Sequence, residues 1–157
     1  MPQWQNLFSA LREHDINVSA QDMPRPVGGG DISAAWRVRA DDQLVFLKTG
    51  PASALDMFLA EADGLKELAK ANAVRVPRVL GCVCSGKESL LALEWIDFQL
   101  PSVSTEWMFG RNLANLHRYT ADRFGWHRDN TIGSVSYTHL TLPTTLCMCR
   151  SRWWRYH

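Results

Sequence analysis

The stretch Pro26-Val27-Gly28-Gly29-Gly30-Asp31-Ile32-Ser33 decides the fold of this 157-residue chain. Three consecutive glycines allow the backbone to approach a ligand closely, because no Cβ intervenes and positive φ angles are open to them. Two strand-like apolar runs, 34–39 and 44–49, follow directly. The stretch therefore predicts a turn between strands that can lie over a phosphate group.

Lys48 and Glu61 are the next candidates for function. Lys48 follows Val45-Phe46-Leu47, which indicates a buried strand, and Glu61 lies in 55–71, where apolar residues recur at helical spacing. A glycine-rich turn, a strand lysine and a helix glutamate, in this order, are parts of a kinase nucleotide-binding lobe. There the turn covers the phosphates, the lysine holds them and the glutamate orients the lysine. The order and spacing predict an ion pair between Lys48 and Glu61.

Each of these features has a plainer interpretation when taken alone. The glycine run matches neither G-x-G-x-x-G nor G-x-x-x-x-G-K-[ST], and an isolated run of this kind is usually a flexible turn. A lysine that closes a strand usually ends in solvent, and a helix glutamate usually lies on a solvated face. The inference of a nucleotide site therefore depends on the combination.

Composition and charge favour small-molecule chemistry. The chain is 46% hydrophobic, which is enough for a packed core, and its net charge of +1 gives no argument for binding nucleic acid or membrane. No stretch approaches roughly eighteen uninterrupted apolar residues, and the start has no basic stretch followed by an apolar run. We expect a cytoplasmic protein.

The four cysteines form two Cys-x-Cys pairs, Cys82/Cys84 and Cys147/Cys149. Zinc sites more often use Cys-x-x-Cys. On a strand, the two members of a Cys-x-Cys pair share one face. We therefore expect Cys82 and Cys84 to be buried thiols and assign no metal site.

Periodicity places the remaining elements. An amphipathic helix is expected over 3–14, and hairpins are expected from 32–39 with 43–49 and from 75–84 with 88–96. Ser53 is a candidate cap for the helix that carries Glu61, Gly64 is expected to permit close packing, and Ser104 or Thr105 is expected to open a helix to about residue 119. The pattern predicts an α+β fold: an antiparallel sheet with a helix like αC of protein kinases.

A set of short motifs spread over the chain resembles the fructosamine (ketosamine) kinase family, with a match from about residue 1 to residue 134. The motifs are Gly28-Gly29-Gly30-Asp31-Ile32-Ser33, Phe46-Leu47-Lys48, Phe58-Leu59-Ala60-Glu61-Ala62-Asp63-Gly64-Leu65, Val76-Pro77-Arg78-Val79-Leu80-Gly81, Leu93-Glu94-Trp95-Ile96, Leu113-Ala114-Asn115-Leu116-His117-Arg118 and Phe124-Gly125-Trp126-His127-Arg128-Asp129-Asn130-Thr131-Ile132-Gly133.

The resemblance implies a fold like that of aminoglycoside and choline phosphotransferases. It also implies phosphorylation of ketosamines, typically at the sugar 3-hydroxyl, with ATP and Mg²⁺. By this resemblance, Lys48 contacts the α- and β-phosphates and pairs with Glu61, and the backbone of Glu94 and Ile96 meets adenine. The phosphates are covered by Gly28, Gly29, Gly30, Asp31, Ile32 and Ser33.

The resemblance also predicts three regions. Residues 1–96 form the nucleotide-binding lobe with its N-terminal helix, 97–134 form a linker and the start of a helical C-terminal lobe, and 135–157 form an atypical tail. The tail has no acidic residue and carries a Trp153-Trp154 pair, so we interpret it as foreign or out-of-frame sequence, with a divergent native tail as the alternative.

No catalytic base or metal ligand is assigned to this chain. The family's His-Gly-Asp type loop and metal-binding aspartate are not recognisable after residue 134. His127-Arg128-Asp129 resembles the protein-kinase catalytic loop, but that loop needs an asparagine five residues after its aspartate, where Ser134 stands. We interpret 127–129 as a structural loop.

Three hypotheses follow. The first is a ketosamine kinase represented by a truncated and inactive chain, with an uncovered lobe surface that favours self-association. The second is a non-catalytic binding module with a kinase-like lobe. The third is a relative of the aminoglycoside or choline phosphotransferases with another substrate.

Overall fold

The computed structural model describes residues 2–19, 22–28, 33–100 and 102–120, together with the backbone of 130–132 and 135–137. The chain divides into two compact units, Met1–Tyr119 and Thr120–His157. The elements of the first unit are α1 (Trp4–Arg12), β1 (Arg25–Pro26), β2 (Ala34–Ala40), β3 (Gln43–Pro51), a 3-10 turn η1 (Ala52–Ala54), α2 (Leu55–Lys70), β4 (Val79–Ser85), β5 (Glu88–Glu94) and α3 (Val103–Leu116).

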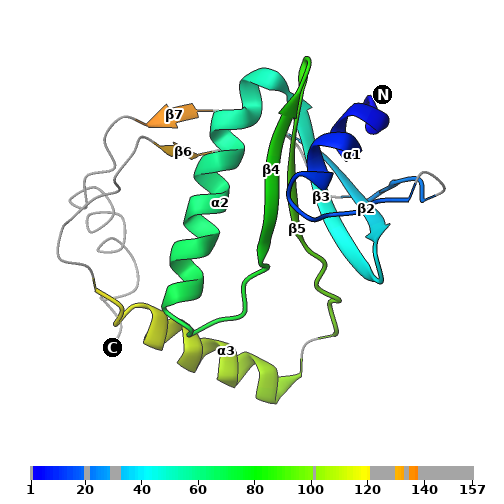
Figure 1. Cartoon of the computed structure of the whole chain (residues 1–157). Helices are drawn as coiled ribbons and strands as arrows, with labels where there is room; N and C mark the ends of the chain where they lie inside the picture. Colours follow the sequence, from blue (N-terminus) through cyan, green and yellow to red (C-terminus); the bar gives the residue numbers. More distant parts are fainter. Residues whose placement is uncertain are drawn as a thin grey trace. The chain divides into compact units, whose positions relative to one another are not determined.

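A five-stranded antiparallel sheet in the order β1-β2-β3-β5-β4 is the centre of the first unit (Figure 1). The two expected hairpins form, β2 with β3 and β4 with β5, and their turns carry Asp41 at φ 50° and Gly86 at φ 62°. Pairing of β3 with β5 joins the hairpins, with Lys48 opposite Leu91. The predicted α+β class is confirmed, with the short strand β1 added at the edge.

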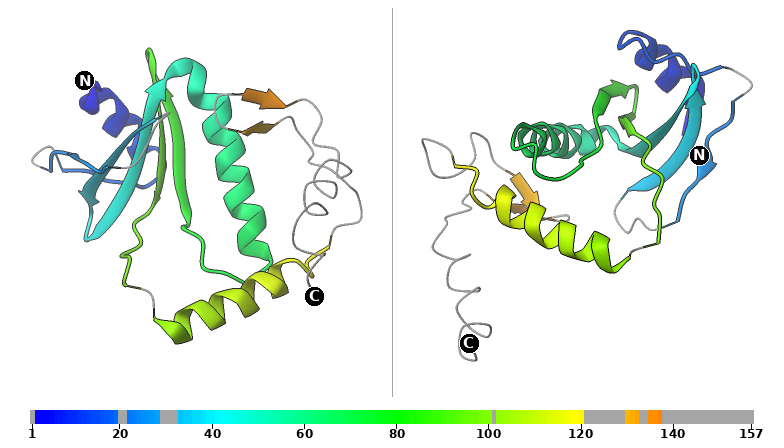
Figure 2. Two further views of the ribbon diagram at one scale, coloured as in Figure 1. Left: turned by 180° about the vertical axis from the view of Figure 1, so that it is seen from behind. Right: turned by 90° about the horizontal axis from the view of Figure 1, so that it is seen from below.

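The sheet's two faces are covered by different helices, α1 on one face and α2 on the other (Figures 1 and 2). Because side chains alternate along a strand, β3 contributes to both faces. Val45 and Leu47 belong to the core cluster that includes α1, whereas Phe46 packs against the cluster that includes Phe58 of α2. We call these the α1 face and the α2 face.

Helix α1 forms as its apolar spacing predicts. Its buried residues Leu7, Phe8 and Leu11 recur on one side and join the α1-face core. At its start, Trp4 meets the β2 residue Trp36 edge to face, with ring centroids 5.0 Å apart. Burial of this stripe is what holds α1 on the sheet.

Helix α2 also forms where expected, but two details of its prediction are wrong. Ser53 is not its N-cap because Ser53 lies inside η1; the N-cap is Ala54, whose side chain has no acceptor for a cap bond. Gly64 does not serve close packing: a Cβ added there would meet no atom within 4 Å. The helix turn at Gly64 has room for a Cβ, so it tolerates glycine without requiring it.

Helix α3 begins at Val103, and Ser102 caps it in place of the expected Ser104 or Thr105. Ser102 has extended backbone, and its hydroxyl accepts a hydrogen bond from the Thr105 N–H at 3.3 Å, which satisfies one of the helix's free donors. No residue of α3 is buried. Large apolar side chains such as Trp107 and Phe109 are therefore exposed, at 67% and 59%.

The cysteines of β4 are only partly as predicted. Cys82 and Cys84 share one face of the strand, yet Cys82 is half-buried and Cys84 is exposed. Burial, followed by the neighbouring Cys84, raises the pKa of the Cys82 thiol to about 11. The expectation of two buried thiols is wrong for Cys84, because β4 is an edge strand and only its first half is covered on that face by the cluster that includes Phe58.

In the second unit, the described backbone is a hairpin of β6 (Asn130–Ile132) with β7 (Val135–Tyr137). This strand pairing lies across position 134, where the sequence analysis placed the end of the native pattern. The rest of the predicted tail, and the interpretation of 127–129 as a structural loop, lie outside the described residues. No helix in the described part of the chain is long and apolar enough to cross a membrane.

Candidate nucleotide site

Lys48 of β3 and Glu61 of α2 are brought together on the α2 face. Their Nζ and Oε2 atoms are 2.6 Å apart, and their side chains are 25% and 33% exposed. The ion pair predicted from the sequence is therefore confirmed. Because both side chains are partly exposed to solvent, a ligand can reach the ammonium group without displacing buried core residues.

The local folding explains this meeting. Leu47 is fully buried on the α1 face, so the next residue of the strand, Lys48, points to the α2 face. On α2, Phe58 anchors the helix in the core, and Glu61 lies three residues later on the same side. The Lys48 Nζ also lies 5.9 Å from the centroid of the Phe58 ring, at the edge of cation–π range.

The glycine-rich turn is described only at its ends. The Val27 N–H donates to the Ala35 carbonyl at 2.9 Å, so strand pairing continues from β1 up to the turn. At Gly28 an added Cβ would meet nothing within 4 Å, which leaves open space at the entry to the turn. Ser33 is half-buried at its exit, whereas the candidates Gly29, Gly30, Asp31 and Ile32 lie outside the described residues.

Glu94 ends β5, beside the strand that carries Lys48. The register pairs Lys48 with Leu91 and Val45 with Glu94, so the two candidates lie on neighbouring strands three residue pairs apart. The candidate Ile96 follows two residues later and is half-buried. The structure thus places Lys48 and Glu94 on one pair of strands, with Ile96 just beyond the end of β5.

The side chain of Glu94 is fixed by two arginines, Arg75 and Arg78, that were not among the predicted site residues. Its carboxylate accepts hydrogen bonds from the Arg78 N–H at 3.2 Å and from the Arg75 guanidinium at 3.1 Å. The bond from the Arg78 backbone, with the arginine charges, lowers the pKa of Glu94. The Glu94 N–H donates to the Arg78 carbonyl at 2.9 Å, so it is not available to a ligand. These partners are 16 and 19 residues away in sequence, and no local pattern points to them.

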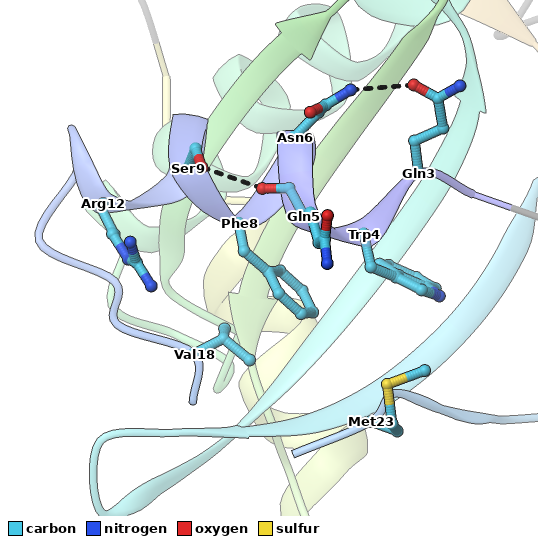
Figure 3. Close-up of a pocket in the computed structure, with 9 residues that line it drawn as sticks. All are labelled: Gln3, Trp4, Gln5, Asn6, Phe8, Ser9, Arg12, Val18 and Met23. Atoms are coloured by element: carbon cyan, nitrogen blue, oxygen red, sulfur yellow. Dashed lines mark hydrogen bonds between the residues drawn. The ribbon is translucent and has the colours of Figure 1, made fainter. Parts of the chain in front are cut away.

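A separate hollow of about 660 Å³ lies along α1, as Figure 3 shows. Trp4, Phe8, Val18 and Met23 give it an apolar wall, and polar groups of α1 line the rest. Two of these polar groups are already engaged: Asn6 donates to the Gln3 side chain and Ser9 to the Gln5 carbonyl, both at 2.9 Å. Arg12 is the one charged residue among the described residues that line it, so these residues offer no acid and base pair for catalysis.

Comparison with known proteins defines the class. The family model for fructosamine kinase matches residues 3–140, so this chain belongs to the fructosamine kinase family. The match extends past residue 134, where the sequence analysis ended the resemblance, and includes the β6–β7 hairpin.

Individual relatives of this chain are also named as kinases of this type. The chain is 38% identical over 133 residues to a probable ketoamine kinase from Synechocystis sp. (strain ATCC 27184 / PCC 6803 / Kazusa), covering 84% of this chain and 45% of that protein. It is 36% identical over 113 residues to the chloroplastic protein-ribulosamine 3-kinase of Oryza sativa subsp. japonica, covering 69% of this chain and 32% of that protein.

A solved structure supports the fold. The chain aligns with a putative fructosamine-3-kinase from Haemophilus somnus 129PT at a TM-score of 0.74 and 28% identity, covering 85% of this chain and 45% of the other. The α+β, kinase-like class is therefore shown. The chain spans less than half the length of the relatives it matches.

Proposed function

We propose that this chain is the nucleotide-binding part of an ATP-dependent ketosamine kinase, which transfers the γ-phosphoryl group of ATP to a sugar hydroxyl of an amine-linked ketose. The observation that carries this proposal is the Lys48–Glu61 ion pair at 2.6 Å, on an accessible face of the sheet, in a member of the fructosamine kinase family. The names of its relatives as ketoamine and ribulosamine kinases support the substrate class.

The proposed roles follow the chemistry of phosphoryl transfer, which depends on positioning and charge neutralisation. Lys48 contacts the α- and β-phosphates, and Glu61 holds the ammonium group in place. The turn 28–33 covers the phosphates, and the backbone of Glu94 and Ile96 meets adenine. The arginine contacts of Glu94 support this last role, because they fix the end of β5.

Magnesium requires acidic ligands that the described residues do not supply. Among them, no group of three or more histidine, cysteine, aspartate or glutamate side chains can hold a metal ion. We therefore assign neither the magnesium ligands nor a catalytic base to these residues. We propose that the nucleotide-binding lobe ends at residue 96 and that residues 97–134 are a linker and the start of the C-terminal lobe. The catalytic base and the metal ligands then belong to the part of that lobe that the longer relatives have and this chain does not. The chain as written is then inactive.

The exposed apolar residues near α3 support this division. Phe98 and Leu100 are each 95% exposed, and Trp107 of α3 is 67% exposed. Large exposed apolar patches usually mark surfaces that another element covers. We propose that the remaining length of the protein covers them, and that the present chain self-associates through them. A cytoplasmic location, where ATP is available, completes the proposal.

The test compares the present chain with a chain extended to the length of its relatives. ADP release is measured with ATP and Mg²⁺ in the presence of a small fructosamine, choline or an aminoglycoside. We expect release only from the extended chain and only with the fructosamine. Release with choline or the aminoglycoside alone would favour the third hypothesis. ATP binding by the extended chain without phosphoryl transfer to any acceptor would favour the non-catalytic module.

A further inference from the structure

Three arginines of β1 and β2 line one hollow of about 440 Å³: Arg25, Arg37 and Arg39. Arg25 lies directly opposite Arg37 in the β1–β2 pairing, and Arg39 follows Arg37 by two residues, so all three belong to the same face of the sheet. That face is the α2 face, because Arg37 is paired with Phe46. Helix α2 itself packs on β4 and β5, near the other edge.

The three guanidinium groups lack acidic partners among the described residues. None of the ion pairs formed there involves Arg25, Arg37 or Arg39. Among the described residues that line the hollow, Asp22 is the one carboxylate, so positive charge is in excess there. Like charges directly opposite each other on paired strands repel. An anion that bridges Arg25 and Arg37 would remove this repulsion.

Arg37 is held in position before any ligand arrives. Its guanidinium lies over the Trp95 ring, 5.3 Å from the ring centroid, and Arg37 is half-buried. Trp95 is fixed in turn, since its indole N–H donates to Asp97 at 2.7 Å and its ring lies 6.3 Å from that of Phe46. Preorganisation of this kind lowers the entropic cost of binding an anion.

We infer that this arginine hollow is a binding site for a small organic phosphate, separate from Lys48. Guanidinium groups match phosphate oxygens through paired hydrogen bonds, and a phosphate ester carries nearly two negative charges at pH 7. The volume lies in the range of small-molecule pockets, and the site is concave. Met23, Pro24 and Leu44 supply apolar walls for the organic part of the ligand.

The arginine hollow adjoins the candidate nucleotide site, because Arg37 lies over Trp95, which stands in the sequence between the adenine candidates Glu94 and Ile96. None of the described residues that line the hollow is itself a nucleotide-site candidate. Lys48 is paired with Ala35, and Arg37 is two residues further along β2 on the same face, roughly 7 Å away along the strand. The inference does not require the proposed kinase activity, because it depends on the arginines, Trp95 and the hollow alone.

Pyrophosphate is the probe, titrated into the present chain carrying Lys48→Ala, so that the lysine of the nucleotide site cannot contribute. Binding is followed by isothermal titration and by the indole N–H signal of Trp95 in NMR spectra. We expect saturable binding that moves the Trp95 signal, at least a tenfold loss of affinity in Arg37→Gln and in Arg25→Gln, and less than a twofold change in the control Arg12→Gln on α1. Circular dichroism checks that each variant is folded.

Three results would overturn the inference. Absence of saturable pyrophosphate binding in the folded Lys48→Ala chain would remove the site. Equal losses in Arg37→Gln and Arg12→Gln would show general attraction of anions to the surface. Binding of an acidic glutamate peptide, but not of pyrophosphate, would indicate a protein partner in place of a small phosphate. None of these results depends on whether the extended chain phosphorylates a ketosamine.

Discussion

The two faces of the sheet differ in the side chains that they receive from the same strands: one face receives apolar side chains, and the other also receives charged ones. On the α1 face, Val45 and Leu47 of β3 are buried, at 2% and 0% exposure, in one continuous apolar cluster. On the α2 face, Lys48 of the same strand is half-buried and charged, and arginines of β1 and β2 lie beside it. Along β3 the α1 face is thus apolar at Val45 and Leu47, whereas the α2 face combines its own apolar cluster around Phe58 with the candidate binding groups.

The largest expected effect is a difference in stability between substitutions at two neighbouring residues of β3, Leu47 on the α1 face and Lys48 on the α2 face. Leu47→Ala removes a fully buried side chain from the α1-face core and is expected to lower the free energy of unfolding by about 2–5 kcal/mol. Lys48→Ala removes one member of a pair that is 25% and 33% exposed, and is expected to cost no more than about 1 kcal/mol. Urea unfolding followed by circular dichroism measures both. Equal losses would show that the lysine pair is part of the core.

The reactivities of the two cysteines of β4 show how much of that strand is covered by the core cluster around Phe58. The Cys82 thiol is half-buried with its pKa raised to about 11, so little thiolate is present at pH 8. Cys84 is exposed. We expect iodoacetamide to alkylate Cys84 at least about ten times faster than Cys82 at pH 8, since one pKa unit changes the thiolate fraction tenfold. Peptide mapping by mass spectrometry measures the two rates. Equal alkylation rates in the native chain would mean that the cluster around Phe58 does not shield Cys82 from the reagent.

The outer side of α2 is open at Gly64, in contrast to its packed side at Phe58. A Cβ at Gly64 meets nothing within 4 Å, so Gly64→Ala gains helix propensity without a clash. We expect the free energy of unfolding to rise by about 0.5–1 kcal/mol. Ala62→Gly, at a buried position of the same helix, is the control and should destabilise. A loss of stability in Gly64→Ala would reveal a close neighbour at that turn.

The smallest expected effect concerns repulsion on the α2 face. Arg25→Gln removes one of two like charges that are directly opposite on β1 and β2, and is expected to raise the free energy of unfolding by about 0.2–1 kcal/mol at low salt without phosphate. The gain should shrink in 1 M NaCl, where charges are screened. Thermal unfolding at the two salt concentrations measures it. A loss of stability at low salt would contradict the assignment of Arg25 and Arg37 as unneutralised neighbours.

Much of the fold was predictable because its signals are local. The helical spacing of Leu7, Phe8 and Leu11 predicted α1, and the turns at Asp41 and Gly86 lie where the polar gaps between apolar runs suggested. The Lys48–Glu61 pair was also predictable, because a strand lysine and a helix glutamate thirteen residues later form a recurring arrangement.

The rest depends on contacts between distant residues. The pairing of β1 with β2 sets Arg25 opposite Arg37, and nothing in a two-residue strand specifies that register in advance. The pairing of Glu94 with Arg75 and Arg78 requires the loop before β4 to pass beside the end of β5. The cap at Ser102 was missed because several hydroxyl residues stand together there, and only the backbone shows which one is extended.

We propose that Lys48, on the α2 face, holds the nucleotide phosphates. This claim is tested most directly by the kcat/KM for ATP of the chain extended to the length of its relatives, with a fructosamine as acceptor. Lys48→Ala is compared with Lys87→Ala, a control lysine in the turn between β4 and β5. We predict a loss of about 100-fold or more for Lys48→Ala, because the positive charge that positions the α- and β-phosphates is removed, and less than a twofold change for Lys87→Ala. Unchanged kcat/KM in a folded Lys48→Ala protein would contradict the claim.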